Sequence, residues 1–95
     1  MSIGQAGRMV RLMSVPVGYD EDIEASQRVA RHLLVHMERR KWTEAQLARE
    51  LKVSRSTVNR LLKGSRGIGL GLALRIARRL LISPHDLLLE EPKQD

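Results

Sequence analysis

The stretch "SRSTVNRLLKG", residues 54–64, decides the fold of this chain. Its apolar residues, Val58, Leu61 and Leu62, recur at the spacing of one helical turn, which predicts a short helix with one buried face. The opposite face carries arginine, lysine, serine and asparagine side chains and no acid. Ser54 is a favoured N-cap residue and Gly64 is typical of a position just past a helix end, so both ends of the helix are marked. The surrounding sequence indicates what this acid-free face is suited to bind.

The basic charge of the chain is concentrated around this stretch. The 95 residues carry a formal net charge of +6. Residues 39–66 hold nine basic and two acidic side chains, a net +7, whereas the rest of the chain sums to −1. A charge excess confined to one window is the expected footprint of a surface that binds a polyanion.

The composition excludes several classes of protein. The chain has no cysteine, which excludes disulfides, thiolate metal sites and cysteine nucleophiles and suits a reducing cytoplasm. Trp42 and Tyr19 are its only aromatic residues, which disfavours a base-stacking platform for single strands. No apolar run approaches the roughly 20 residues of a membrane span. Residues 1–18 lack the continuous apolar core of a secretory signal. We therefore expect a cytoplasmic protein.

The apolar spacing predicts an all-α domain of five helices over residues 20–91. The first helix begins at Asp20 or Asp22 and ends near Arg40. The second opens at Thr43, where "TEAQ" fits a capping box, and ends at residue 51. The third is the opening stretch, the fourth follows the glycine-rich "SRGIGLG", and the fifth is "SPHDLLLEE" with Ser83 as its cap. Residues 1–19 are expected to form a flexible arm and residues 92–95 a tail.

Two buried stripes follow from this spacing. In the first helix we expect Ile23, Ala30, Leu33, Leu34 and Met37 to face the core. In the fourth we expect Leu70, Ala73, Leu74, Ala77, Leu80 and Leu81 to do so. His32 and His36 lie one turn apart without a third metal ligand nearby, so we expect surface side chains and no metal site.

The helices at 43–51 and 54–63, joined by a short turn, form a helix-turn-helix. The major groove of DNA is about 12 Å wide and accepts one α-helix. Arginine pairs bidentately with guanine there, and asparagine with adenine. An acid on the exposed face would repel phosphate, and none is present. The pattern therefore indicates a helix that reads double-stranded DNA.

A family resemblance rests on two longer stretches. "TEAQLARELKVSRSTVNRLLKG" (43–64) resembles the helix-turn-helix of the lambda-repressor-like (Cro/repressor, XRE-type) DNA-binding family. "LALRIARRLLISPHDLL" (72–88) is similar to that family's fourth and fifth helices. The resemblance runs from about residue 24 to residue 90. It implies a five-helix regulator, typically a repressor, that binds double-stranded DNA as a homodimer with its recognition helices about 34 Å apart.

The resemblance also implies the contacts. Base contacts fall on four side chains of the third helix: Arg55, Ser56, Asn59 and Arg60. Phosphate contacts fall on Thr43, Thr57, Lys63 and Arg66, with backbone amides near the starts of the second and fourth helices. Neither a cofactor nor a metal is implied. The sequence shows no nucleophile–base pair or carboxylate dyad, so we expect no enzyme.

Several residues depart from the family pattern. Glu44 stands where many members have a phosphate-binding glutamine, so we expect it to turn outward. Lys52 and Leu81 occupy positions that often hold glycine, and a left-handed Lys52 would be strained by about 1 kcal/mol. Met37 and Leu62 replace a buried arginine–glutamate pair. Because both partners are apolar, no charge is stranded, and such an exchange is often neutral or stabilising.

Three further features leave alternatives open. "RLLKG" with "GI" and "ALRIARRL" is similar to the HigA-type antitoxin branch of the family, whose members repress their own operon and neutralise a toxin. The alternative function is therefore an antitoxin that binds a small toxin protein. "GIGLG" follows no predicted strand, so we interpret it as a flexible loop or as a close approach of the fourth helix to a phosphate. Four apolar residues exceed what one small core requires and are expected at a dimer or partner interface, with core packing as the alternative: Leu72, Ile76, Leu88 and Leu89.

Overall fold

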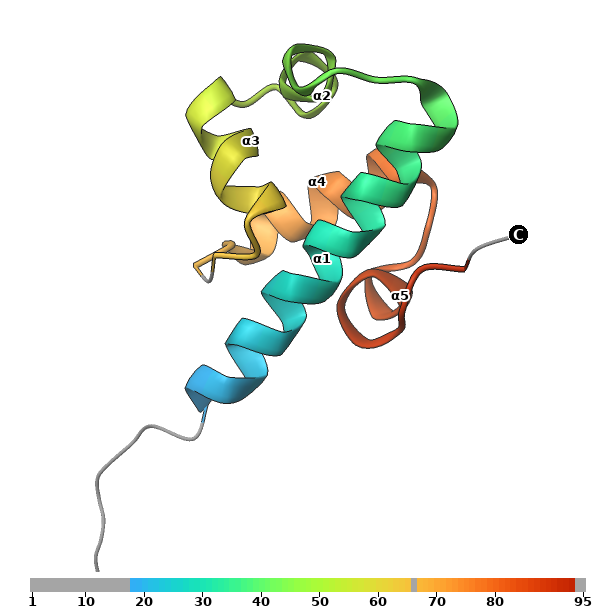
Figure 1. Cartoon of the computed structure of the whole chain (residues 1–95). Coiled ribbons are helices and arrows are strands. Elements are labelled where there is room, and N and C mark those ends of the chain that lie inside the picture. Colours follow the sequence, from blue (N-terminus) through green and yellow to red (C-terminus); the bar gives the residue numbers. More distant parts are fainter. Residues whose placement is uncertain (1–17, 66, 94–95) are drawn as a thin grey trace, which may run out of the picture.

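The computed structural model describes residues 18–65 and 67–93. Within these ranges the chain forms five helices and no strand, so the predicted all-α fold is confirmed (Figure 1). The helices are α1 (Gly18–Arg40), α2 (Glu44–Leu51), α3 (Arg55–Leu62), α4 (Leu70–Leu80) and α5 (Pro84–Leu89). The predicted arm, apart from its last two residues, lies outside the described residues, as does Arg66. The first helix begins two residues before the earliest predicted cap, Asp20.

Three predicted N-caps, Thr43, Ser54 and Ser83, form in the structure, whereas α1 begins before the predicted caps Asp20 and Asp22. The Thr43 N–H donates to Gln46 Oε1 at 2.7 Å while the Gln46 N–H donates to Thr43 Oγ1 at 3.1 Å, which completes the capping box of α2. Ser83 Oγ accepts the Asp86 N–H at 3.0 Å at the start of α5, and Pro84 takes the first helical position. These local hydrogen bonds set where α2 and α5 begin.

One hydrophobic core joins the five helices. α1 packs against α3 and α5, α2 packs against α3 and α4, and α4 packs against α5. In Figure 1, α1 crosses the molecule diagonally, α2 and α3 lie beyond one side of it, and α5 lies on the other. The core side chains come from every helix: Val29, Leu33, Leu47, Ala48, Leu51, Val58, Leu61, Ile76, Ala77, Leu80 and Leu87. Met37 and Leu62 are partly buried against this cluster, as the apolar exchange predicts.

Three helices are followed by a left-handed non-glycine residue, and the first of these is Lys41, just after α1, with φ +58°. Lys52, just after α2, has φ +58°, and Leu81, just after α4, has φ +62°. Each conformation costs a non-glycine residue on the order of 1 kcal/mol, as expected for Lys52. Gly64, with φ +73°, closes α3 where a Cβ would lie 3.2 Å from Gln27 Cγ on α1. The glycine therefore lets the end of α3 approach α1 closely.

The buried faces of α1 and α4 differ from the predicted stripes. On α4 the buried side chains are Ala73, Ile76, Ala77 and Leu80. Leu70, Leu74 and Leu81 are exposed, so their assignment to the core is wrong, as is that of Leu34 on α1. The predicted buried stripe of α4 therefore included leucines that lie beside the buried face of the helix rather than on it. Because Ile76 has no exposed surface, its assignment to a dimer or partner interface is also wrong.

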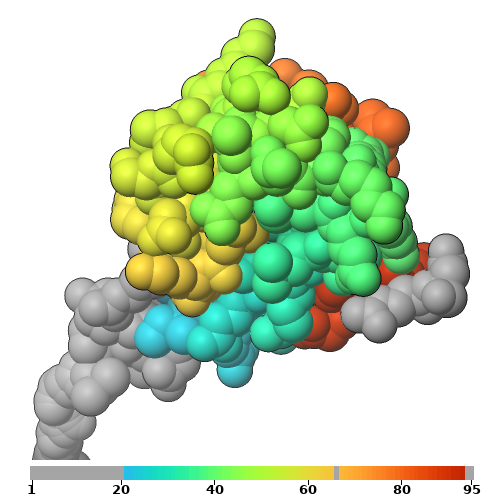
Figure 2. Space-filling view, turned by 45° about the horizontal axis from the view of Figure 1, so that its top comes forward, coloured from blue at the N-terminus to red at the C-terminus, as the bar shows by residue number. Residues whose placement is uncertain are grey.

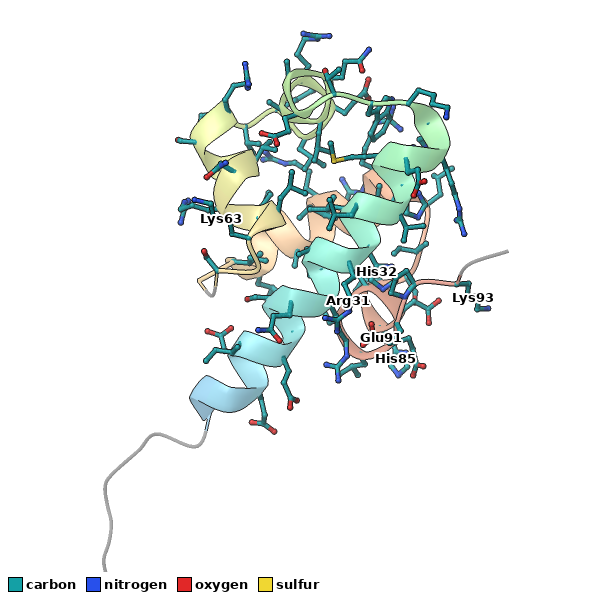
Figure 3. The ribbon with its side chains drawn as sticks, in the orientation of Figure 1. Arg31, His32, Lys63, His85, Glu91 and Lys93 are labelled. Atoms are coloured by element: carbon teal, nitrogen blue, oxygen red, sulfur yellow. The ribbon has the colours of Figure 1, made fainter. Side chains whose placement is uncertain are left out.

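His32 is buried, contrary to the predicted surface position. Its Nε2 donates to the carbonyl oxygen of Glu90 at 2.8 Å, which ties α1 to the segment after α5. Arg31 binds the Glu91 carboxylate with two hydrogen bonds of 2.6 and 2.8 Å. This hydrogen bonding lowers the pKa of Glu91. Figure 3 shows these side chains beside α5, on the opposite side of the molecule from Lys63 of α3.

Candidate nucleic-acid interface

α3 packs against the hydrophobic core through its apolar face, and its polar face is exposed to solvent. Val58 and Leu61 are buried, at 0% and 3% exposure, and anchor the helix to the core. All four predicted base-contacting side chains are exposed on the same helix: Arg55, Ser56, Asn59 and Arg60. α2 and α3 lie side by side on one face of the molecule (Figure 2). The structure therefore gathers the predicted reading residues on one surface.

Hydroxyl groups are linked at the start of α3. Ser54 Oγ accepts the Thr57 N–H at 3.1 Å and donates to Thr57 Oγ1 at 3.0 Å. Ser56 Oγ lies 3.0 Å from Ser54 Oγ. Because Ser54 has one hydroxyl proton and gives it to Thr57, Ser56 is the donor of that bond. The Thr57 hydroxyl keeps its own proton, and the Ser56 oxygen keeps a free lone pair, for a ligand outside the helix.

The predicted phosphate-contacting residues occupy different environments. Lys63, the C-cap of α3, is exposed and projects away from the body of the molecule (Figure 3). Thr43 is exposed at the N-cap of α2, where its hydroxyl accepts from Gln46 and is free to donate. Thr57 is half-buried and lines a small hollow with Arg60 and Ser65. The structure thus spreads these residues along the edges of the α2–α3 surface.

The acidic residues of α2 do not cancel the charge of α3. Glu50 accepts a 2.6 Å hydrogen bond from Arg79 Nε of α4, so its charge is neutralised on the inner side of α2. Glu44 is exposed in the first turn of α2, as predicted. α3 itself contributes Arg55 and Arg60 and no acid. The exposed face of α3 is therefore electropositive.

Two positioning residues escaped the sequence prediction. Arg75 of α4 donates to the carbonyl oxygen of Leu51 at 3.1 Å and to that of Lys52 at 3.4 Å. It thereby caps the C-terminal end of α2, immediately before the turn into α3. Trp42, between α1 and α2, has Arg40 and Arg79 over its ring at 4.9 and 5.3 Å from the centroid. These contacts fix the orientation of the helix pair.

The described residues hold no group of three or more potential metal ligands that could bind a metal ion. No helix within the described ranges is long and apolar enough to span a membrane.

The comparison with protein families gives one match. The Helix-turn-helix family model matches residues 36–87, from the C-terminal end of α1 into α5. The chain belongs to the XRE-type, lambda-repressor-like helix-turn-helix family. This XRE-type protein is therefore a DNA-binding regulator, which confirms the predicted family and the coarse function. No curated protein and no solved structure matches the chain significantly. The antitoxin branch stays a prediction.

Proposed function

We propose that this XRE-type regulator is a homodimeric repressor that acts in the cytoplasm and binds a two-fold symmetric site in double-stranded DNA. One α3 helix of each copy enters the major groove, and the two half-sites lie about one helical turn apart. The observation that carries this proposal is the exposed, acid-free face of α3, which is presented by a buried apolar face and two flanking caps. Occupation of such a site would block access of the transcription machinery to the same DNA.

The side chains of α3 divide into base contacts and phosphate contacts. Arg55 and Arg60 are suited to the O6 and N7 acceptors of guanine, and Asn59 to the N6 and N7 atoms of adenine. Ser56 is suited to either a base or a phosphate because its hydroxyl donates and accepts. The proposed phosphate contacts, which fix the register of the protein on the duplex, are Thr43, Thr57, Lys63 and Arg66.

The test compares three arginine-to-alanine variants. Arg55→Ala and Arg60→Ala should each cost about 1–3 kcal/mol of specific binding and relax the base preference. Arg78→Ala is the matched control, because Arg78 is also exposed but lies on α4. Affinity should be measured by titration against a selected DNA site at several salt concentrations, since counterion release makes it fall steeply with salt. Unchanged affinity in both α3 variants would remove the recognition-helix assignment.

A further inference from the structure

Two residues, Lys52 and Val53, join the end of α2 to the Ser54 N-cap of α3, and we call them the α2–α3 turn. The Lys52 N–H donates to the carbonyl oxygen of Arg49 at 3.2 Å, and the Val53 N–H donates to that of Ala48 at 3.0 Å. This pair of bonds is the Schellman motif, whose left-handed residue is usually glycine. Here the left-handed residue is Lys52. Because one residue separates it from Ser54, its backbone sets the direction in which α3 leaves α2.

The same motif ends three other helices of the chain. The left-handed residue is Lys41 after α1, Gly64 after α3 and Leu81 after α4. Within residues 18–65 and 67–93, the end of α2 is the one of the four whose carbonyl groups accept hydrogen bonds from a side chain of another helix. This additional contact is therefore found at the turn that places the proposed reading helix.

The donor is Arg75 of α4. Its Nη1 donates to the carbonyl oxygen of Leu51 at 3.1 Å and to that of Lys52 at 3.4 Å. A guanidinium group is always charged, and hydrogen bonds from a charged donor are stronger than those between neutral groups. The two acceptors lie at the C-terminal end of α2, where the helix dipole favours a cation. The contact thus stabilises Lys52 in a conformation that a lysine adopts at a cost.

We propose that Arg75 is a positioning residue for DNA recognition. It holds the α2–α3 turn in its left-handed form and thereby fixes the orientation of α3 relative to α2. This inference rests on the DNA-reading role of α3 proposed above, and it adds a residue of α4 that acts on that role. One helical turn along α4, Arg79 Nε donates to Glu50 Oε1 at 2.6 Å. That second contact joins α4 to a side chain of α2 and leaves the turn untouched.

Loss of the Arg75 contact should change the orientation of α3 without unfolding it. The Ser54 cap is local, and Val58 and Leu61 still anchor α3 in the core. Base contacts require each side chain to meet one base edge, whereas non-specific binding depends on charge alone. Specific binding should therefore weaken more than non-specific binding.

The first comparison uses Arg75→Met, which removes the guanidinium donors and keeps an unbranched side chain. This variant should bind a selected DNA site about 3- to 30-fold more weakly than the wild type. Its affinity for unrelated DNA of the same length should fall no further than that of Arg78→Met. Arg78→Met controls for the lost charge, because Arg78 is exposed on the same helix. Circular dichroism verifies that each variant is folded at the assay temperature, and Arg75→Gln serves in the same comparisons if Arg75→Met is not.

The second comparison repeats the substitution in a Lys52→Gly background. Glycine adopts the left-handed conformation without support, so the contact from Arg75 is no longer needed there. In this background Arg75→Met should weaken specific binding by less than about threefold, because the two positions are coupled. Arg79→Met, which leaves the α2–α3 turn untouched, should have the same effect in both backgrounds. Urea unfolding should show the same coupling without DNA, with a smaller decrease of the midpoint by Arg75→Met in the Lys52→Gly protein.

Equal losses of specific binding from Arg75→Met in the two backgrounds, as expected if Arg75 contacts a phosphate directly, would overturn the proposal. So would a loss no larger than that of Arg78→Met, or equal decreases of the urea midpoint in both backgrounds. The wild type keeps the two proposals apart. Absence of any specific site for the wild type would reject the proposed function and the positioning role together, whereas a wild type that binds specifically while the losses are equal rejects the role of Arg75 alone.

Discussion

The outer faces of α3 and α4 are both exposed, yet they are chemically opposite. α3 presents arginine, serine and asparagine side chains that can donate or accept hydrogen bonds in several directions. α4 exposes two leucines, Leu70 and Leu74, together with Gly71, Arg75 and Arg78. A polar, electropositive helix face is suited to a hydrated polyanion, whereas an apolar face is stabilised only by exclusion of water. The comparison therefore favours the α3 face over the α4 face as the DNA-binding surface.

The largest expected effect is on the free energy of unfolding, and it compares a buried leucine of α3 with an exposed leucine of α4. Leu61→Ala should destabilise the protein by about 2–5 kcal/mol, because Leu61 is buried and its truncation leaves a cavity. Leu70→Ala, the same change at an exposed position, should stay within about 0.5 kcal/mol. Urea unfolding of both variants measures the difference. Equal losses would mean that Leu70 is buried within the monomer.

The next largest effect is on DNA-binding affinity, and it distinguishes base contacts from phosphate contacts within the α3 face. Asn59→Ala should cost about 1–3 kcal/mol at its cognate base pair and broaden the preference there. Lys63→Ala should weaken binding evenly across sequences and reduce the salt slope by about 1. Competition binding against single-base variants of a selected site distinguishes the two patterns. A uniform loss in Asn59→Ala would place that side chain on the backbone rather than on a base.

A smaller effect tests the strain at the end of α4. Leu81→Gly should raise the unfolding free energy by up to about 1 kcal/mol, because glycine accepts φ +62° without strain. The greater freedom of glycine in the unfolded chain offsets part of this gain. A thermal melt that shifts downward would show that the Leu81 side chain contributes to the monomer fold.

The smallest expected effect is on the pH dependence of stability, and it concerns His36 of α1, which lies on neither face. Burial, with Arg40, Arg39 and His32 nearby, lowers the pKa of His36. As the pH is lowered, His36 is therefore protonated in the unfolded chain before it is protonated in the folded protein. The free energy of unfolding should consequently decrease as the pH drops below about 6.5. Urea midpoints between pH 7.5 and about pH 5.5 should decrease in the wild type and change less in His36→Gln. An identical pH dependence in both proteins would assign the decrease to other groups.

Local signals explain why so much of the fold was predictable. The caps at Thr43, Ser54 and Ser83 depend on residues within one turn of each helix, so the sequence contains all the information that they need. The exposed face of α3 was predictable for the same reason, since its apolar residues mark one side and its polar residues the other. The left-handed Lys52 was predicted from the family resemblance, because that position often holds glycine.

The errors concern contacts between distant parts of the chain. His32 is buried because it donates to Glu90, 58 residues away, which periodicity within α1 does not reveal. Arg75 caps α2 from α4, across a separation of 24 residues from Leu51. α4 carries apolar residues on two neighbouring stripes, so its spacing permits either as the buried one. Packing against α2 and α5 selects the stripe that contains Ile76.

Selection of bound fragments from random double-stranded DNA tests the central claim most directly. The wild-type protein and Arg60→Ala would be selected in parallel and the enriched sequences compared. The account predicts a two-fold symmetric site with half-sites about one helical turn apart, and a broadened preference within each half-site for Arg60→Ala. No enrichment by the wild type, or the same site with the same preference from both proteins, would contradict the assignment of α3 as the reading helix.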